Sequence, residues 1–340
     1  MSLEASSVGR GPTLDEVARL AGVSRSTASR ALNGGVASPQ TVEAVERARA
    51  ELGFVPNRAA RDLARRRTDS VAIVIQETPA AIFHNPFHAL VTTALATRFW
   101  EAGLQPLLAL MDPFEPEPTV GRILHRGHVD GVVVSAFQES PPVENLLTGS
   151  GLPTVFIGRP PRPDSLPYVD VDNRRGAHLA TRHLLERGRR RIACLGGPAT
   201  LSSGVDRRQG WLDAHHEAGI APGPYLGGAA DTASARDQAQ RLLRQHPAID
   251  AIVAYSDAVA AGAIQALRAA GRAIPDDIAL TGVDNFATAT EVCPNLTTVA
   301  QPVPELARAA ADLLIGYLQN GAWPAWPRIL ATELIVRDST

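Results

Sequence analysis

The sequence predicts an α/β protein in which an all-α module at the N-terminus precedes a larger core of parallel sheets covered by helices. Three observations support this prediction. Residues 13–52 contain three helical segments without a strand between them, and from residue 71 short apolar strands alternate with amphipathic helices. The length of 340 residues also exceeds that of one small domain, so two or three domains are expected.

Composition excludes several classes of protein. Apolar residues make up 45% and charged residues 20% of the chain, which is typical of a soluble globular protein. No run of eighteen apolar residues occurs, and the first twelve residues lack the apolar segment of a secretory signal, so we expect a cytoplasmic protein. Cys194 and Cys293 are too few for a disulfide framework or a zinc cluster. We therefore expect no metal and no cofactor.

The first helix is predicted to begin after Thr13. Thr13 and Glu16 have the spacing of a capping box, in which each side chain satisfies a free backbone donor of the other residue. Leu14, Val17 and Ala18 then recur at helical spacing and predict one buried face. The helix is expected to end at a glycine that permits a tight turn.

The second and third helices are predicted over 24–32 and from residue 39 to residue 52. Ser24 can cap the second helix, and Pro39 suits the first turn of the third because its missing N–H is not needed there. The spacing predicts that Ala28 and Ala31 face inward while Arg25 and Arg30 face outward. A helix, a short glycine-containing turn and a second helix form the helix-turn-helix pattern.

A strongly basic segment, residues 56–68, follows these helices. It contains five arginines and one isolated large apolar residue, Leu63, and Asn57 can cap a short helix there. Residues 1–70 hold 11 Arg against 8 acidic residues, whereas the rest of the chain holds 22 against 27. This asymmetry is weak evidence that the N-terminal part meets a polyanion.

The core is predicted from its alternating pattern. Strands are expected at 71–76, 105–110, 130–134, 153–157, 191–196, 250–254 and 278–283. Helices are expected at 87–102, 174–187, 205–218, 234–245, 257–270 and 303–319. Continuous apolar strands joined by helices indicate parallel sheets that are buried on both faces. The pattern alone allows either one large sheet or two lobes.

Several motifs resemble the LacI/GalR family of bacterial transcription regulators. They are the segment from Val23 to Asn33, the segments 54–57 and 60–63, Arg207-Arg208-Gln209-Gly210-Trp211, Gly282-Val283-Asp284-Asn285, and the segment from Pro294 to Val299. The resemblance covers the whole chain, and these motifs occurring together are highly specific. It implies a helix-turn-helix domain over 12–55, a hinge helix over 56–68 and a two-lobed, periplasmic-binding-protein-like core over 69–340.

The resemblance implies how DNA is bound. Arg25, Ser26 and Arg30 stand where the family reads bases, and arginine can make two parallel hydrogen bonds to guanine. Ser24, Thr27 and Asn33 are expected to contact phosphates or to support the fold. The hinge is expected to add Asn57, Arg61 and Leu63, with Leu63 wedged into the minor groove. The alternatives of a solvated polar helix face and of Leu63 packing on the core stay open.

One hinge residue departs from the family pattern. Asp62 stands where the family usually has a small residue, and a carboxylate near phosphates is unfavourable unless Arg58 or Arg66 neutralises it. The departure puts the strength of the hinge contact in doubt.

The resemblance also implies an effector site between the two lobes. The first lobe is expected over 69–167 and 300–324, and the second over 168–299 and 325–340. The expected effector contacts are Phe87, His88, Arg207, Ser256, Asp284 and Gln301. Asp284 follows the strand 278–283, where parallel sheets hold ligands and a carboxylate can accept hydrogen bonds from sugar hydroxyls. For each residue a structural role stays open: Asp284 can cap a turn and Phe87 can belong to the core.

The sequence therefore predicts a homodimeric repressor that binds a pseudo-palindromic DNA operator and responds to a sugar effector. The motifs of common hydrolases, phosphate-binding loops, dinucleotide-binding folds and zinc proteases do not occur, so we expect no catalytic residues. The alternatives are a solute-binding protein with the same core, an activator or dual regulator, and an enzyme built on the doubly wound core. A helix-turn-helix without a secretory signal argues against the first.

Overall fold

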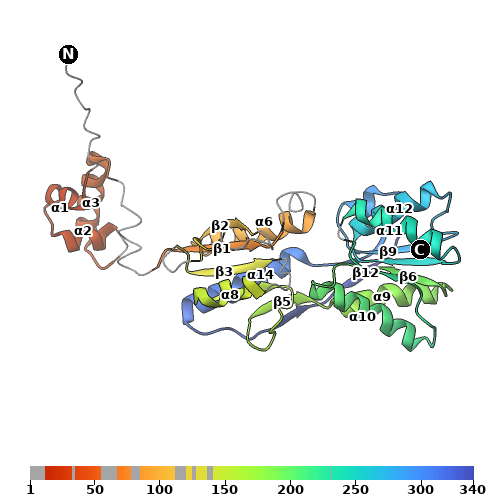
Figure 1. Cartoon of the computed structure of the whole chain (residues 1–340). Coiled ribbons are helices and arrows are strands. Elements are labelled where there is room, and N and C mark those ends of the chain that lie inside the picture. The colour runs from red at the N-terminus through yellow and green to blue at the C-terminus, as the bar shows by residue number, and fades with distance from the viewer. Residues whose placement is uncertain are drawn as a thin grey trace, which may run out of the picture. The chain divides into compact units, whose positions relative to one another are not determined.

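A computed structural model of the chain shows two compact units, residues 1–68 and 69–340 (Figure 1). The structure describes residues 12–32, 35–54, 67–77, 85–111, 120–124, 128–135, 141–229 and 231–340. Among these residues, no helix combines the length and the apolar composition that a membrane span requires.

The N-terminal unit is a three-helix domain formed by α1 (Leu14–Leu20), α2 (Arg25–Leu32) and α3 (Pro39–Leu52). The predicted capping box is confirmed, since the backbone N of Thr13 donates to Glu16 Oε2 over 2.7 Å and that of Glu16 to Thr13 Oγ1 over 3.4 Å. The glycine expected after the first helix is Gly22, which follows α1 in the left-handed conformation, and Gly53 ends α3 in the same way. Small side chains from all three helices form the core: Val17, Ala18, Ala28, Ala31, Val45 and Ala48, with Phe54.

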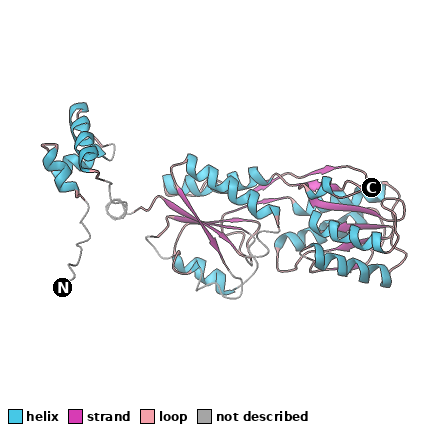
Figure 2. Cartoon of the chain, turned by 90° about the horizontal axis from the view of Figure 1, so that it is seen from above, coloured by secondary structure: helices cyan, strands magenta, loops and turns pink. Residues whose placement is uncertain are grey.

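The first lobe of the core contains a six-stranded parallel sheet in the order β11-β5-β4-β3-β1-β2. Its strands are β1 (Ser70–Ile75), β2 (Gln105–Leu110), β3 (Gly131–Ser135), β4 (Thr154–Ile157), β5 (Tyr168–Val171) and β11 (Arg328–Leu330). The helices α6 (Pro86–Glu101) and α14 (Val303–Asn320) pack on one face, and α8 (Pro141–Ser150) packs on the other (Figure 2).

The second lobe repeats this plan in the order β12-β10-β9-β8-β6-β7. Its strands are β6 (Ile192–Leu195), β7 (Tyr225–Leu226), β8 (Ala251–Ala254), β9 (Ala279–Asp284), β10 (Thr297–Ala300) and β12 (Glu333–Ile335), and only the pair β10–β12 is antiparallel. One face carries α9 (Asn173–Glu186) and α10 (Ser202–Glu217). The other carries α11 (Thr232–Gln245) and α12 (Asp257–Ala269), with the short α13 (Thr288–Glu291) beside them.

The chain passes between the two lobes three times: from β5 to α9, from β10 to α14, and from β11 to β12. The first and third passages are hydrogen-bonded to each other, because Asp172 N donates to Leu330 O over 3.0 Å and Thr332 Oγ1 to Asp172 O over 3.5 Å. Three connecting segments that cross between two lobes are the arrangement expected of a hinge. We call this region the interlobe junction.

Two strands lie in a different sheet from the one expected for them. Residues 168–171 and 328–330 were assigned to the second lobe, but β5 pairs with β4 and β11 pairs with β5, so both extend the first sheet. Each strand is too short to have a distinctive apolar pattern, and the lobe that it joins depends on its pairing partner. The first sheet therefore extends one strand, β5, beyond the lobe boundary predicted at residue 167.

Candidate DNA-binding and effector sites

The outward face of α2 carries the predicted base-reading residues. Arg25, Ser26 and Arg30 are exposed, while Ala28 and Ala31 are buried against the other two helices. The Ser24 hydroxyl caps the helix, accepting from the backbone N of Thr27 over 3.1 Å. It also lies 2.9 Å from Ser26 Oγ and 2.8 Å from Thr27 Oγ1, so the beginning of α2 presents three linked hydroxyls.

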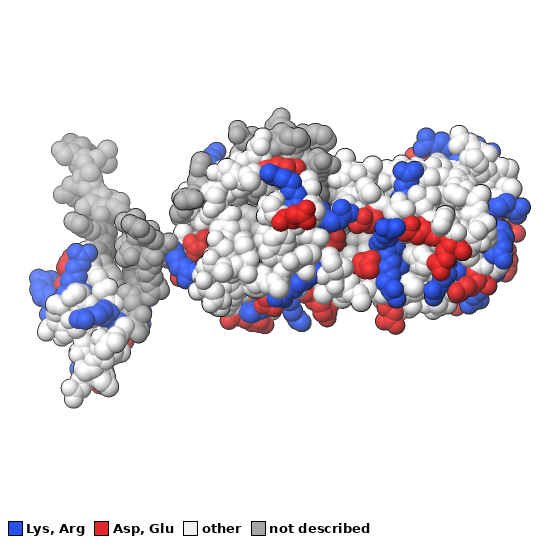
Figure 3. Space-filling view, turned by 90° about the horizontal axis from the view of Figure 1, so that it is seen from below, with Lys and Arg blue, Asp and Glu red and all other residues white. Residues whose placement is uncertain are grey.

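The arginines of α2 are only loosely engaged. Arg25 Nε lies 3.6 Å from Asp15 Oδ1, and these side chains are 70% and 65% exposed. Arg30 Nη2 lies 3.5 Å from Thr27 Oγ1. Exposed pairs of this kind contribute little to stability, so both guanidinium groups can exchange their partners for base edges or phosphates. Figure 3 shows more basic than acidic side chains on the visible face of this unit. The other predicted DNA contacts, Asn33, Asn57, Arg61 and Leu63, with Asp62, lie outside the described residues.

We expect Arg25→Ala to weaken binding to the operator by about 1–3 kcal/mol and to relax the preference at one base-pair position. The reason is that the exposed guanidinium can bind one guanine through two hydrogen bonds. Fluorescence anisotropy against a set of single-base operator variants measures both effects. Arg47→Ala removes an equally exposed charge from α3 and serves as the control. Equal weakening on every sequence would show that Arg25 contacts phosphates instead.

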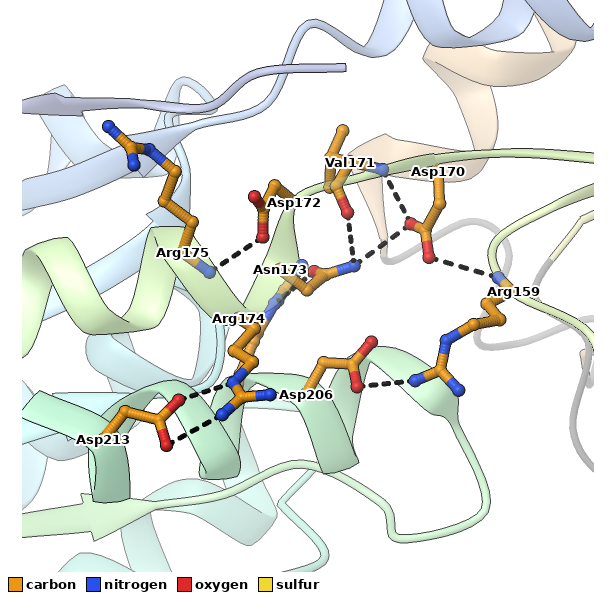
Figure 4. A network of polar contacts seen from close by, with 10 residues as sticks. Arg159, Asp170, Val171, Asp172, Asn173, Arg174, Arg175, Asp206 and Asp213 are labelled. Atoms are coloured by element: carbon orange, nitrogen blue, oxygen red, sulfur yellow. Dashed lines mark hydrogen bonds and ion pairs between the residues drawn. The ribbon is translucent and has the colours of Figure 1, made fainter. Parts of the chain in front are cut away.

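At the interlobe junction, the predicted effector residue Arg207 is buried and held by its own neighbours. Its Nε donates to Asn173 Oδ1 over 2.9 Å and its Nη1 to the carbonyl oxygen of Tyr255 over 2.7 Å. The guanidinium also lies over the Tyr255 ring, 4.7 Å from the centroid. Asn173 in turn donates to Asp170 Oδ1 over 3.0 Å, and Figure 4 shows the network around these residues. Arg207 therefore has a fixed orientation before any ligand binds.

Asp284 and Gln301 are brought together at the same junction. Asp284 ends β9 with φ at 123°, and the next residue, Asn285, has φ at 59°, so the chain turns sharply away from the sheet. Gln301 Nε2 donates to Asp284 Oδ1 over 2.5 Å. Burial raises the pKa of Asp284, and the nearby positive charge of Arg207 opposes this increase. Three of the six predicted effector residues are thus close in space.

Asp257, which the sequence analysis did not select, holds this turn through hydrogen bonds. Its buried carboxylate accepts from Phe286 N over 3.0 Å and from Thr298 Oγ1 over 2.5 Å. Burial raises its pKa, and repulsion from the neighbouring carboxylate of Asp284 adds to the increase. Asp257 therefore joins the loop after β9 to β10.

The other three predicted residues have structural roles at the ends of helices. Ser256 caps α12, since its hydroxyl accepts from Val259 N over 3.2 Å. Phe87 and His88 lie in the first turn of α6, with their rings edge to face at a centroid distance of 5.7 Å. Phe87 packs partly on the first-lobe core. Whether these three residues also contact an effector stays a prediction.

His88 is a buried imidazole that is 3% exposed, and its Nδ1 has no hydrogen-bond partner among the described residues. Burial lowers its pKa to about 4 because the charged form loses its hydration. The ring is therefore neutral at neutral pH. A neutral, buried ring nitrogen without a partner among the described residues can accept a hydrogen bond from a ligand or water.

This shift predicts how stability depends on pH. The unfolded chain binds a proton on His88 near pH 6.5, but the folded protein binds it only near pH 4, so stability is lost as pH falls between these values. Relative to His88→Asn, the wild-type protein should lose roughly 2 kcal/mol more stability between pH 7 and pH 5. Urea unfolding at both pH values measures the difference, because the two proteins share all other titrating groups. Identical pH dependence would mean that the imidazole titrates normally.

Several junction residues were missed by the sequence analysis. Asn173 and Asp170 belong to the segment Asp170-Val171-Asp172-Asn173, where two buried polar side chains mark the passage from β5 to α9. Ser135 ends β3 beside Ile75, and its buried hydroxyl has no partner among the described residues. Polar residues at or just after the end of a strand were the available signal in the sequence. Two surface pockets, one beside Leu212 and the other beside Trp323, include none of the predicted effector residues.

Comparison with known proteins identifies both parts of the chain. Residues 13–57 match the model for bacterial regulatory proteins of the lacI family, and residues 181–340 match the periplasmic binding protein-like domain. The HTH-type transcriptional regulator CelR of Thermobifida fusca is 40% identical over 336 residues, covering 97% of this chain and 98% of CelR. The ribose operon repressor of Halalkalibacterium halodurans is 32% identical, covering 96% of this chain and 97% of the repressor.

Solved structures agree with these relationships. The complex of the transcriptional regulator CelR with cellobiose has a TM-score of 0.76 and 37% identity, covering 97% of this chain and all of CelR. The lac repressor dimer bound to operator and the anti-inducer ONPF has a TM-score of 0.84 and 25% identity, covering 97% and 99%. Since the likeness extends over the helix-turn-helix unit and both lobes, the chain belongs to the LacI family of bacterial transcription regulators.

Proposed function

We propose that the protein is a homodimeric repressor that binds a pseudo-palindromic operator through α2 and is controlled by a sugar bound at the interlobe junction. One observation carries the second half of this proposal. Arg207 and Asp284 of the second lobe and Gln301 of the second passage are close in space where the chain passes between the lobes. A ligand held there contacts both sides of a hinge and can therefore bind one lobe arrangement better than another.

The chemistry of the junction suits a sugar. Carboxylate, amide and guanidinium groups form hydrogen bonds with hydroxyls, and the aromatic rings of Tyr255, Phe286 and Phe87 provide apolar surface for the ring faces. The relative CelR has been solved with cellobiose. Cellobiose is therefore the first effector to test.

The test has two steps. Operator sequences are first selected from random duplex DNA and from the region flanking the protein's own gene. Anisotropy of a selected duplex is then measured with and without cellobiose, ribose and glucose. We expect a palindromic sequence to be enriched and cellobiose to change its affinity at least 5-fold, the lower end of typical allosteric coupling. Enrichment of no sequence would overturn the regulator assignment, and a response to none of the sugars would overturn the sugar assignment.

The proposed dimer is supported by an apolar stripe on α6. Leu90, Thr93, Thr97 and Trp100 recur at helical spacing, with Leu90 40% and Trp100 65% exposed. The two threonine hydroxyls donate to backbone carbonyls one turn earlier, over 2.8 and 2.9 Å, so they are paired within the helix itself. Leu108 of the neighbouring strand β2 is also half exposed. Three exposed large apolar side chains on one helix and the strand beside it favour a protein interface here.

We expect Trp100→Asp to raise the dimer dissociation constant at least about 30-fold, because it places a charge where a large aromatic side chain is buried in the dimer. Analytical ultracentrifugation of the full chain measures this change. Operator affinity should fall with it, since two half-sites are then no longer bound together. Trp100→Leu keeps an apolar side chain and should remain mainly dimeric. A dimer unaffected by Trp100→Asp would place the interface elsewhere.

Two further expectations belong to this proposal. The protein acts in the cytoplasm, where its DNA target is accessible, and it releases its sugar chemically unchanged. The family relationship supports both expectations, since its members are transcription regulators. Chromatography of the sugar after prolonged incubation with the protein measures any turnover.

A further inference from the structure

An ion pair beside the interlobe junction connects the two lobes through residues that do not belong to the three crossing segments. Arg159 follows β4 in the first lobe, and its Nη2 lies 2.5 Å from Oδ1 of Asp206 in α10 of the second lobe. The two side chains are 37% and 25% exposed. Neither residue is among the predicted effector contacts.

The first-lobe half of the pair is held rigidly. Gly158 N donates to Val169 O over 2.8 Å, and Arg159 N donates to Asp170 Oδ2 over 3.1 Å. The other oxygen of Asp170 accepts from Asn173, the residue that also binds Arg207. Figure 4 shows Asp170 between the backbone of Arg159 and the side chain of Asn173. The loop after β4 is therefore fixed to β5 and, through Asn173, to the junction.

The second-lobe half belongs to the same turn of α10 as the effector residue Arg207. Asp206 reaches Arg159, while Arg207 reaches Asn173 at the start of α9. Consecutive residues of one helix thus contact the loop after β4 and the hinge. A rotation of the lobes about the hinge must change the distance between Arg159 and Asp206, because they lie on opposite lobes and outside the crossing strands.

We propose that Arg159 and Asp206 are positioning residues for the effector response, forming an interlobe tie that stabilises the lobe arrangement of this structure. An interaction made in only one of two arrangements biases the equilibrium between them, and so sets how far an effector can shift it. This inference rests on the proposed control of operator binding by a sugar at the junction. It adds the two residues that set the strength of that control.

The chain contains a matched control for this tie. Arg174 of α9 contacts Asp213 of α10 through two bonds, Nε to Oδ2 over 2.5 Å and Nη2 to Oδ1 over 3.0 Å. Asp213 lies two helical turns beyond Asp206, and both partners belong to the second lobe. Removing this pair removes the same kind of interaction from within one lobe.

The experiment uses the full chain and six variants: Arg159→Ala, Asp206→Ala, their double variant, Asp206→Glu, Arg174→Ala and Asp213→Ala. The first measurement is hydrogen exchange of residues 158–173 and 202–208 without any sugar. The second is the ratio of operator dissociation constants with and without cellobiose. Asp206→Glu tests whether the carboxylate itself restores both quantities.

We expect Arg159→Ala and Asp206→Ala each to speed exchange in both segments and to change the dissociation-constant ratio about 3- to 10-fold. The double variant should change the ratio no further than either single variant, since one interaction is lost in all three. Asp206→Glu should stay close to wild type, and the two control variants should leave the ratio unchanged.

Three results would overturn the tie: unchanged exchange in Arg159→Ala and Asp206→Ala, additive effects in the double variant, or equal effects in the control variants. Failure of the proposed effector gives a different result. If cellobiose does not act on the wild-type protein, the dissociation-constant ratio is one in every variant, but hydrogen exchange still decides whether the pair joins the lobes.

Discussion

Replacing Gly210 with alanine is expected to lower the free energy of unfolding of the core by about 3 kcal/mol. Helices α9 and α10 approach so closely here that an added Cβ would lie 2.0 Å from the carbonyl oxygen of Arg174 and 2.9 Å from the backbone N of His178. Both atoms belong to the backbone of α9, so the clash can be relieved only by moving a whole helix. Urea unfolding followed by circular dichroism measures the loss.

Gly149→Ala is the matched control for this prediction. Gly149 also lies within a helix, α8, but among the described residues nothing beyond the adjoining helix backbone lies within 4 Å of its added Cβ. Alanine has the higher helix propensity, so this variant should be unchanged or more stable by about 0.5–1 kcal/mol. Equal destabilisation by both substitutions would contradict the close packing of α9 on α10. Because α10 also carries Asp206 and Arg207, Gly210→Ala should weaken the effector response as well.

Replacing Asp284 with alanine is expected to weaken effector binding at least about 30-fold while operator binding without effector stays close to wild type. The carboxylate lies at the end of β9 beside Gln301 and can accept hydrogen bonds from sugar hydroxyls. Its loss leaves the effector hydroxyls and the Gln301 amide without a partner, and truncating a charged hydrogen-bonding group costs about 2–5 kcal/mol. Calorimetry with cellobiose and anisotropy with the operator measure the two affinities.

Asp284→Asn separates the charge from the backbone conformation. Residue 284 has a positive φ, which asparagine adopts more readily than alanine, so this variant should fold like the wild type. It should still bind effector more weakly, because an amide has one acceptor oxygen in place of two. A full effector response in both variants would move the effector site away from the loop after β9.

Local sequence was sufficient to predict the helices of the N-terminal unit. The stops at Gly22 and Gly53, the caps at Thr13 and Ser24, and the buried face of each helix all depend on residues within one or two turns. Such interactions can be predicted because their partners are close in sequence. The apolar strands β1, β3, β4, β6, β8 and β9 were predicted for a similar reason, since burial on both faces gives a continuous run of apolar residues.

Local sequence was not sufficient to predict the contacts of the interlobe junction. Arg207 and Asp284 were predicted as effector contacts, and both lie at the interlobe junction. Asn173 and Tyr255 were not selected, although they bind Arg207 from positions 34 and 48 residues away. The strands β5 and β10 contain polar residues that are buried only because neighbouring strands and helices cover them. Their sheet membership depends on pairing, which no local pattern encodes.

The sequence by itself therefore determined the three N-terminal helices, the outward position of Arg25, Ser26 and Arg30, and the parallel α/β character of the core. These features follow from helical periodicity, capping and apolar runs, all of which act over short distances along the chain. Only the tertiary structure decided which lobe β5 and β11 join, which residues hold Arg207, and that Arg159 contacts Asp206. The reason is that long-range pairing places together residues whose separation in sequence carries no information about their contact.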